Sequence, residues 1–283
     1  MDLNSVSQTE GKAKAGSHMI TLYTRKNFTK IHKYAIMLQA TKHNIVKEVK
    51  EQYNMSYIIA ICCLVAFYII TIRNMNHLTK PKIVNALVSL SIFAIYIYVV
   101  YHAYESVGFD DWNFQNTLPV ANVSPFMFST MPLSWVLPKK AKKHYFLLIT
   151  LLSLGMLFSS IFSCAFNAIR NYKFHWSFFA DYLAHILLSL WGVYLVKSKQ
   201  VELKKRDCII AGSLIVSVAL IMLVLNIIFD TAFFGLSLNG KHSIYNVVIV
   251  ENSVISALIY LSGLVFILAL GYLYNKMLNK KIK

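Results

Sequence analysis

Two residues that can exchange a proton stand four positions apart in an otherwise apolar stretch of the chain. Asp181 and His185 both fall within the apolar segment 178–196. A spacing of four places their side chains on one face of a helix, one turn apart. A carboxylate beside an imidazole favours the charged ring and fixes the position of its proton, which suits proton transfer or the binding of a polar headgroup. We therefore take Asp181 and His185 as the candidate catalytic pair; an interhelical hydrogen bond without chemistry is the alternative.

Other polar side chains lie near the ends of the remaining apolar segments. Polar groups are costly in hydrocarbon, so their positions within membrane spans are a pointer to function. We expect them to line, together with the pair, a polar cavity that opens toward the outer face and is closed below by an apolar plug. The candidate ligand-binding residues are Asn122, Ser124, His102, Asn167, Asn226 and Asp230.

Small residues recur every four positions in the segment 144–166 and just beyond it, and a cysteine lies beside them. Gly155, Ser159, Ser163 and Asn167 form a stripe that would let two helix backbones approach closely. Cys164 could act as a nucleophile if a base lay next to it, and is otherwise a buried inert thiol. The four cysteines lack metal-type or redox spacing. We expect no metal site and no cofactor.

The elements that position these residues are expected to be membrane-spanning helices. Hydrophobic residues make up 57% of the chain and charged residues 14%, against roughly a quarter charged in soluble domains. Long apolar runs recur, each near the ~20 residues that a helix needs to cross a bilayer. The segments are 56–72, 83–103, 118–137, 144–166, 178–196, 208–229 and 253–274. The predicted fold is an all-α polytopic transmembrane bundle over residues 56–276.

The third segment, 118–137, is the exception among the seven. It contains Pro119, Pro125 and Pro132, and each proline frees a backbone carbonyl that must find a partner inside the protein. The sequence therefore predicts seven spans, with six spans and a re-entrant third segment as the alternative.

Basic residues gather at alternate ends of the seven segments. Sixteen would lie on one side of the membrane, while the opposite loops carry only Arg170, Lys173 and Lys241. The positive-inside rule then places the C-terminus, with the basic tail 277–283, in the cytoplasm. The sixteen are Arg73, Lys80, Lys82, Lys139, Lys140, Lys142, Lys143, Lys197, Lys199, Lys204, Lys205, Arg206, Lys276, Lys280, Lys281 and Lys283. We expect a multi-pass protein of the plasma membrane.

The N-terminal stretch 1–55 is polar and basic and conflicts with this topology. Gly16-Ser17-His18-Met19 has the form of a vector-derived segment. We expect the tail to be solvated. The alternative is that residues 27–52 form a helix whose basic face lies on anionic lipid headgroups. Seven spans would export its nine basic residues; a start near Met55 or the six-span alternative would avoid that export.

Three features resemble the YwaF-like bacterial membrane proteins: seven short-looped spans, Leu118-Pro119 at the entry of the third, and Asp181-Tyr182 followed by His185 in the fifth. That family is related to a eukaryotic membrane protein with acyl-transfer activity on ether phospholipids. Family members carry His and Cys at the third span's entry, where this chain has Ala121 and Val123. The resemblance thus implies a lipid-handling helical bundle over residues 56–275, in which His185 corresponds to the family's histidine in the fifth span. It does not imply the family's cysteine chemistry.

Three functions remain open from the sequence. The leading one is binding of a lipid headgroup or small polar molecule in the outward-facing cavity, with or without acyl-transfer-like catalysis. The second is a transporter, or the substrate-capturing subunit of one, which would need a polar path to the cytoplasmic side. The third is a non-catalytic membrane scaffold. The expected partners are membrane lipids and a small-molecule ligand; because the basic residues follow the span ends, we expect no nucleic acid.

Overall fold

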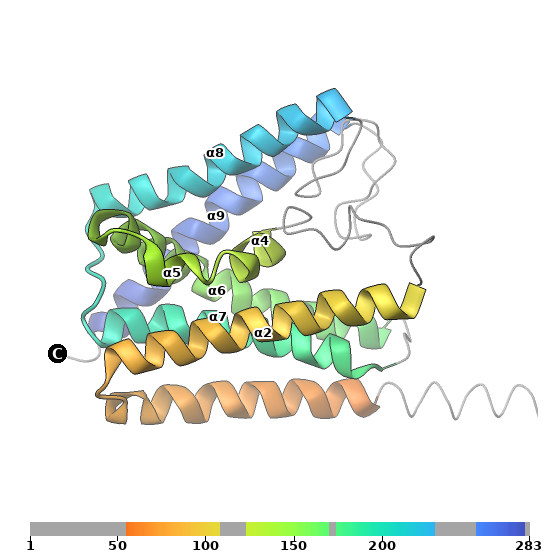
Figure 1. Cartoon of the computed structure of the whole chain (residues 1–283), viewed down its shortest axis with the longest axis horizontal. Coiled ribbons are helices and arrows are strands. Elements are labelled where there is room, and N and C mark those ends of the chain that lie inside the picture. The colour runs from red at the N-terminus through yellow and green to blue at the C-terminus, as the bar shows by residue number, and fades with distance from the viewer. Residues whose placement is uncertain (1–54, 108–122, 170–173, 230–252, 281–283) are drawn as a thin grey trace, which may run out of the picture. The chain divides into compact units, whose positions relative to one another are not determined.

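Helices form the described part of the protein, and six of them are long and apolar enough to cross a bilayer. The computed structural model describes residues 55–107, 123–169, 174–229 and 253–280, and no strand occurs in these ranges. All but the first of these residues belong to one compact unit, Ser56–Lys283. The six helices suited to spanning are Met55–His77, Pro81–His102, Lys139–Ile169, Trp176–Lys197, Lys205–Ile228 and Ala257–Leu278 (Figure 1). The prediction of an all-helical membrane protein is confirmed at this level.

The element labels follow the chain from the end of the first span. The 3-10 turn η1 completes that span, and α2, α6, α7, α8 and α9 are the five long helices that follow it. The bounds are η1 Met75–His77, α2 Pro81–Val107, α4 Val123–Ser129, α5 Leu133–Val136, α6 Lys139–Ile169, α7 Trp176–Lys197, α8 Lys205–Phe229 and α9 Ser253–Lys280.

The predicted third segment consists, where it is described, of two short helices rather than one continuous span. α4 and α5 have seven and four residues, so neither alone could cross a bilayer. Pro125 sits in the first turn of α4, where its missing N–H costs nothing, whereas Pro132 caps α5. Leu137 is extended, as expected for a residue before proline, and so ends α5. The start of the segment, 118–122, lies outside the described residues.

α7 is the central helix of the bundle. It contacts α6, α2, η1 and α9, and its interface with α6 is the most extensive in the described part. Of the 18-residue apolar stretch taken from each span, 72% is buried in α7 and 11% in the Pro81–His102 span. A helix covered on all sides by protein can carry polar side chains that a lipid-facing helix cannot.

A glycine explains how closely α6 and α7 approach. A Cβ added at Gly192 would lie 2.7 Å from the Ser153 Cβ and 2.9 Å from the Ile149 carbonyl oxygen. The Thr150 hydroxyl also points to this place, 3.4 Å from the Gly192 carbonyl oxygen. Only a residue without a side chain allows this contact between the two backbones.

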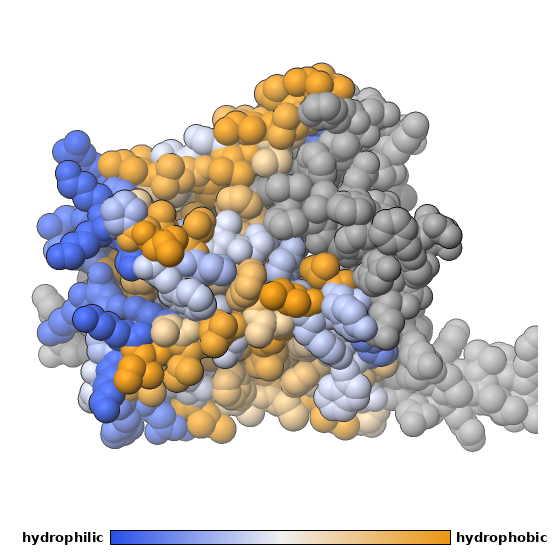
Figure 2. All heavy atoms as spheres, viewed as in Figure 1, coloured by the Kyte–Doolittle hydropathy of each residue, from blue (hydrophilic) through white to orange (hydrophobic). Residues whose placement is uncertain are grey.

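The basic helix ends lie together at one end of the bundle. Tyr194 donates to the Leu78 carbonyl (3.1 Å), and Lys197 donates to the Ile72 carbonyl (3.1 Å). These bonds join the end of α7 to the end of the first span. At the start of α6, Lys143 pairs with Asp207 at the start of α8. Figure 2 shows the resulting hydrophilic end, next to sides where apolar side chains predominate.

Replacing Gly192 with alanine is expected to destabilise the bundle, because the new methyl group has no room between α6 and α7. The expected loss is about 1–3 kcal/mol. Gly263→Ala is the matched control, since a Cβ there meets no atom within 4 Å and alanine favours the helix. Thermal unfolding of the detergent-purified variants measures both, and equal stability of the two variants would contradict the packing described here.

Candidate functional site

His185 is held in a fixed orientation inside the bundle. Its Nδ1 lies 2.8 Å from the backbone carbonyl oxygen of Asp181. A carbonyl can only accept, so Nδ1 carries the proton and Nε2 is the basic nitrogen of the neutral ring. The side chain is buried, and the imidazole and the Phe128 ring of α4 meet in a T-shaped arrangement with their centroids 4.9 Å apart. α4, which belongs to the third predicted segment, thus lies against this ring.

Asp181 differs from its partner in exposure. Its carboxylate Oδ2 lies 3.8 Å from His185 Nδ1, and its side chain is 39% exposed. The carboxylate is therefore the more accessible of the two groups, and the imidazole lies deeper in the bundle. Such a pair can bind a cationic or hydroxyl group and can take up or release a proton.

The polar α6 side chains in this region join α6 to α7 and to the first span. Ser160 donates to the Tyr182 carbonyl (3.0 Å), and the Asn167 side-chain amide donates to the Tyr182 hydroxyl (2.5 Å). Cys164 is buried, and its thiol donates to the Tyr57 carbonyl (3.6 Å). The predicted ligand-binding residue Asn167 is thus engaged with the residue next to Asp181.

His102 pairs with a histidine that the sequence analysis did not single out. Its ring lies 4.1 Å from that of His175, centroid to centroid. His175 is the N-cap of α7, where its Nδ1 accepts from the Ser177 backbone N–H (3.1 Å). His102 of α2 therefore lies beside the N-terminal end of α7, and His175 precedes His185 by ten residues.

The remaining predicted residues are only partly described. Ser124 donates to the Met156 sulfur (3.5 Å), which joins α4 to α6. Asn226 is buried in α8. Asn122 and Asp230 lie outside the described residues. Among the predicted site residues, Asp181 and His185 are thus brought into direct contact.

Two cavities in the described part of the bundle have other linings. One of about 260 Å³ lies between α4, α6 and α9 and includes Ser124, Gly155 and Ser159. One of about 460 Å³ lies mainly between α8 and α9. Neither is lined by Asp181 or His185, so the outward-facing polar cavity stays a prediction.

A line of hydroxyl groups continues the polar face of α7 toward the basic end. Ser189 follows His185 by four residues, about 6 Å along the helix axis. Its hydroxyl donates to the Tyr68 hydroxyl of the first span (3.2 Å), which in turn lies 2.9 Å from the Tyr274 hydroxyl of α9. Sequence spacing could have found Ser189, because it extends the pattern set by Asp181 and His185 by one more turn.

A second buried polar cluster lies in the same half of the bundle. The Asn275 amide nitrogen is within hydrogen-bond distance of the Thr150 carbonyl (2.9 Å), the Ser153 hydroxyl (2.8 Å) and the Gly271 carbonyl (2.9 Å). The expectation of an apolar plug in this half is therefore wrong for the described residues. Buried polar residues nearer the basic end are Ser89, Ser134, Thr150, Ser153, Ser189 and Asn275.

Comparison with known proteins gave no match to a family model, a curated protein or a solved structure.

Proposed function

We propose that this protein binds the polar part of a lipid, or another small polar molecule, at Asp181 and His185 within the membrane. The observation that carries the proposal is the buried, singly oriented imidazole of His185 beside a half-exposed carboxylate. An ionisable pair inside a span is expensive to keep. The two groups differ in exposure. The more exposed Asp181 would receive the ligand, and the deeper His185 would act on it.

An acyl-transfer reaction is the enzymatic form of this proposal. His185 Nε2 would take the proton of an acceptor hydroxyl as that oxygen attacks an acyl ester, and would return it to the leaving oxygen. The resemblance to YwaF-like proteins supports a lipid substrate. The cysteine that the family carries in its third span is missing here, so the proposed reaction has no acyl-cysteine step.

Ligand occupancy tests the binding proposal directly. Native mass spectrometry of the purified protein should detect a bound lipid or solute, and His185→Gln should lower its occupancy about ten-fold, the effect of losing one hydrogen bond to a charged group. His77→Gln, an exposed histidine of η1, is the matched control. Equal occupancy in both variants would exclude His185 from the binding site.

A proton-coupled transporter is the second candidate, and the hydroxyl line favours it. Asp181, His185 and Ser189 follow one face of α7, and Tyr68 and Tyr274 extend that face toward the basic end. A transporter needs such a polar path through the bundle. Hydroxyl groups in contact can pass protons if the gap between His185 and Ser189 is bridged.

Removing one hydroxyl from the line tests the transporter. In proteoliposomes that contain a pH-sensitive dye, Tyr68→Phe should reduce the proton flux that is coupled to solute uptake, because the chain of hydrogen-bonded hydroxyl groups is cut. Tyr98→Phe changes an exposed tyrosine and should have no effect. Flux that is equal in both variants would rule out conduction along this line.

We further propose seven membrane crossings, with the C-terminus in the cytoplasm of a plasma-membrane protein. The ends of the first span and of α7 are hydrogen-bonded to each other, and the starts of α6 and α8 are ion-paired. A six-span topology would place Arg73, Lys80 and Lys82 opposite the later basic clusters. If the chain crosses the membrane between α2 and α6 through the broken third segment, all of these basic residues lie on one side.

Cysteine accessibility in intact cells distinguishes the two topologies. Lys80→Cys, Lys140→Cys and Lys204→Cys should be protected from a membrane-impermeant maleimide, whereas Asn171→Cys should react. The six-span alternative requires Lys80→Cys to react and Lys140→Cys to be protected. The native cysteines all lie in the apolar spans, so the unsubstituted protein gives the background.

A further inference from the structure

An apolar groove between α8 and α9 is separate from the α7 site. It has a volume of about 460 Å³, and its floor includes Leu151 of α6. Gly212 leaves it open on α8, and Ala269 contributes a small side chain on α9. Two of its lining residues, Ile209 and Val265, are 62% and 53% exposed. The groove therefore opens to the surface of a helix pair suited to lie in lipid.

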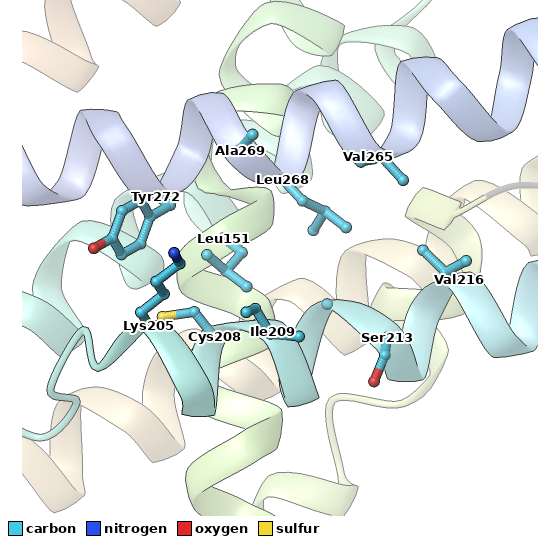
Figure 3. Close-up of a pocket in the computed structure, with 11 residues that line it drawn as sticks. Leu151, Lys205, Cys208, Ile209, Ser213, Val216, Val265, Leu268, Ala269 and Tyr272 are labelled. Carbon is cyan, nitrogen blue, oxygen red and sulfur yellow. The ribbon is translucent and has the colours of Figure 1, made fainter.

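The two ends of the groove differ in charge. Figure 3 shows Lys205 beside Tyr272 at one end, and Val216 and Val265 at the other. The ammonium group of Lys276 lies over the Tyr272 ring, 5.5 Å from its centroid, and adds a second cation near this end. From Lys205 to Val216 the groove follows α8 for about 16 Å. A ligand that fits has a long apolar part and an anionic head.

Two neighbouring lysines, Lys204 and Lys143, are already paired with carboxylates. Lys204 is paired with Glu202 at 2.9 Å, and Lys143 is paired with Asp207. The hydrogen bond from Lys204 to Glu202 also raises the pKa of Lys204. Lys205, which reaches the groove itself, is thus the cation best placed to meet an anionic head that enters with its chain.

We propose that this groove binds an anionic glycerophospholipid, with one acyl chain between α8 and α9 and the phosphate at Lys205 and Lys276. Basic sites between transmembrane helices commonly receive anionic headgroups in this way. A second membrane helix would have to place an acidic or polar residue against both lysines. A lipid already combines the required chain and charge, and the bilayer supplies it at high local concentration.

Photolabelling of the full chain tests the site. The protein is reconstituted in phosphatidylcholine vesicles that contain a trace of phosphatidylglycerol with a diazirine in its acyl chain. Peptide mapping should locate labels on the α8 residues 209–216 and on the α9 residues 265–269. Unlabelled phosphatidylglycerol should compete for these labels better than added phosphatidylcholine does.

Two matched pairs of variants assign the head and the chain. Lys205→Gln should lower labelling of the groove about five-fold, the effect of one basic contact with an anionic lipid, whereas the exposed neighbour Arg206→Gln should not. Gly212→Leu fills the groove and should abolish the labels, whereas Ser217→Leu, at an exposed α8 position that does not line the groove, should keep them. If Gly212→Leu does not fold, the comparison of Lys205→Gln with Arg206→Gln still tests the site.

Three results would overturn the proposal: equal labelling by phosphatidylglycerol and phosphatidylcholine probes, equal labelling of Lys205→Gln and Arg206→Gln, or a dimer whose formation blocks the groove labels. The last result would assign the groove to a second copy of the chain. None of them bears on His185, so the binding proposal at α7 stands or fails separately.

Discussion

The scarcity of hydrogen-bond partners in hydrocarbon is the constraint on which this structure depends. A polar side chain facing lipid leaves its donors and acceptors unpaired, so such groups must meet one another inside the bundle. α7 satisfies this requirement by being the helix most completely covered by protein. Its polar face can therefore hold a carboxylate, an imidazole and a hydroxyl in succession, while α2, α8 and α9 expose apolar side chains.

The same constraint explains the hydrogen bonds that join the helices near the basic end. Near the basic end, amides, hydroxyls and indole groups pair with one another, as when Trp191 and Gln200 both bond to the Asn85 side chain (2.9 and 2.6 Å). These contacts fix α2 against α7. Farther along α7, the His185 ring lies against Phe128 and within hydrogen-bond distance of the Asp181 carbonyl oxygen. A half of the bundle that is fixed by hydrogen bonds suits a helix that must keep His185 in one orientation.

The sequence predicted the helical class, the bounds of six long apolar segments to within six residues, and the contact of Asp181 with His185. Run length and a spacing of four are local properties, which is why they can be read from the sequence. It could not resolve 118–137, where hydrophobicity favours a span and prolines favour a break. It also missed the line from Ser189 to Tyr274. Tyr68 and Tyr274 are 206 residues apart, and an isolated tyrosine in an apolar run looks like an interface residue until its partner is known.

The central claim is that His185, on the polar face of α7, is turned into the bundle and lies against Phe128 of α4. A photoreactive phenylalanine analogue incorporated at Phe128 tests it directly, because this ring meets His185. We expect irradiation to give an intramolecular crosslink that maps to the α7 residues 181–189. Crosslinks that go to bulk lipid or to α8 instead would show that His185 does not lie under α4, and would contradict the proposed site.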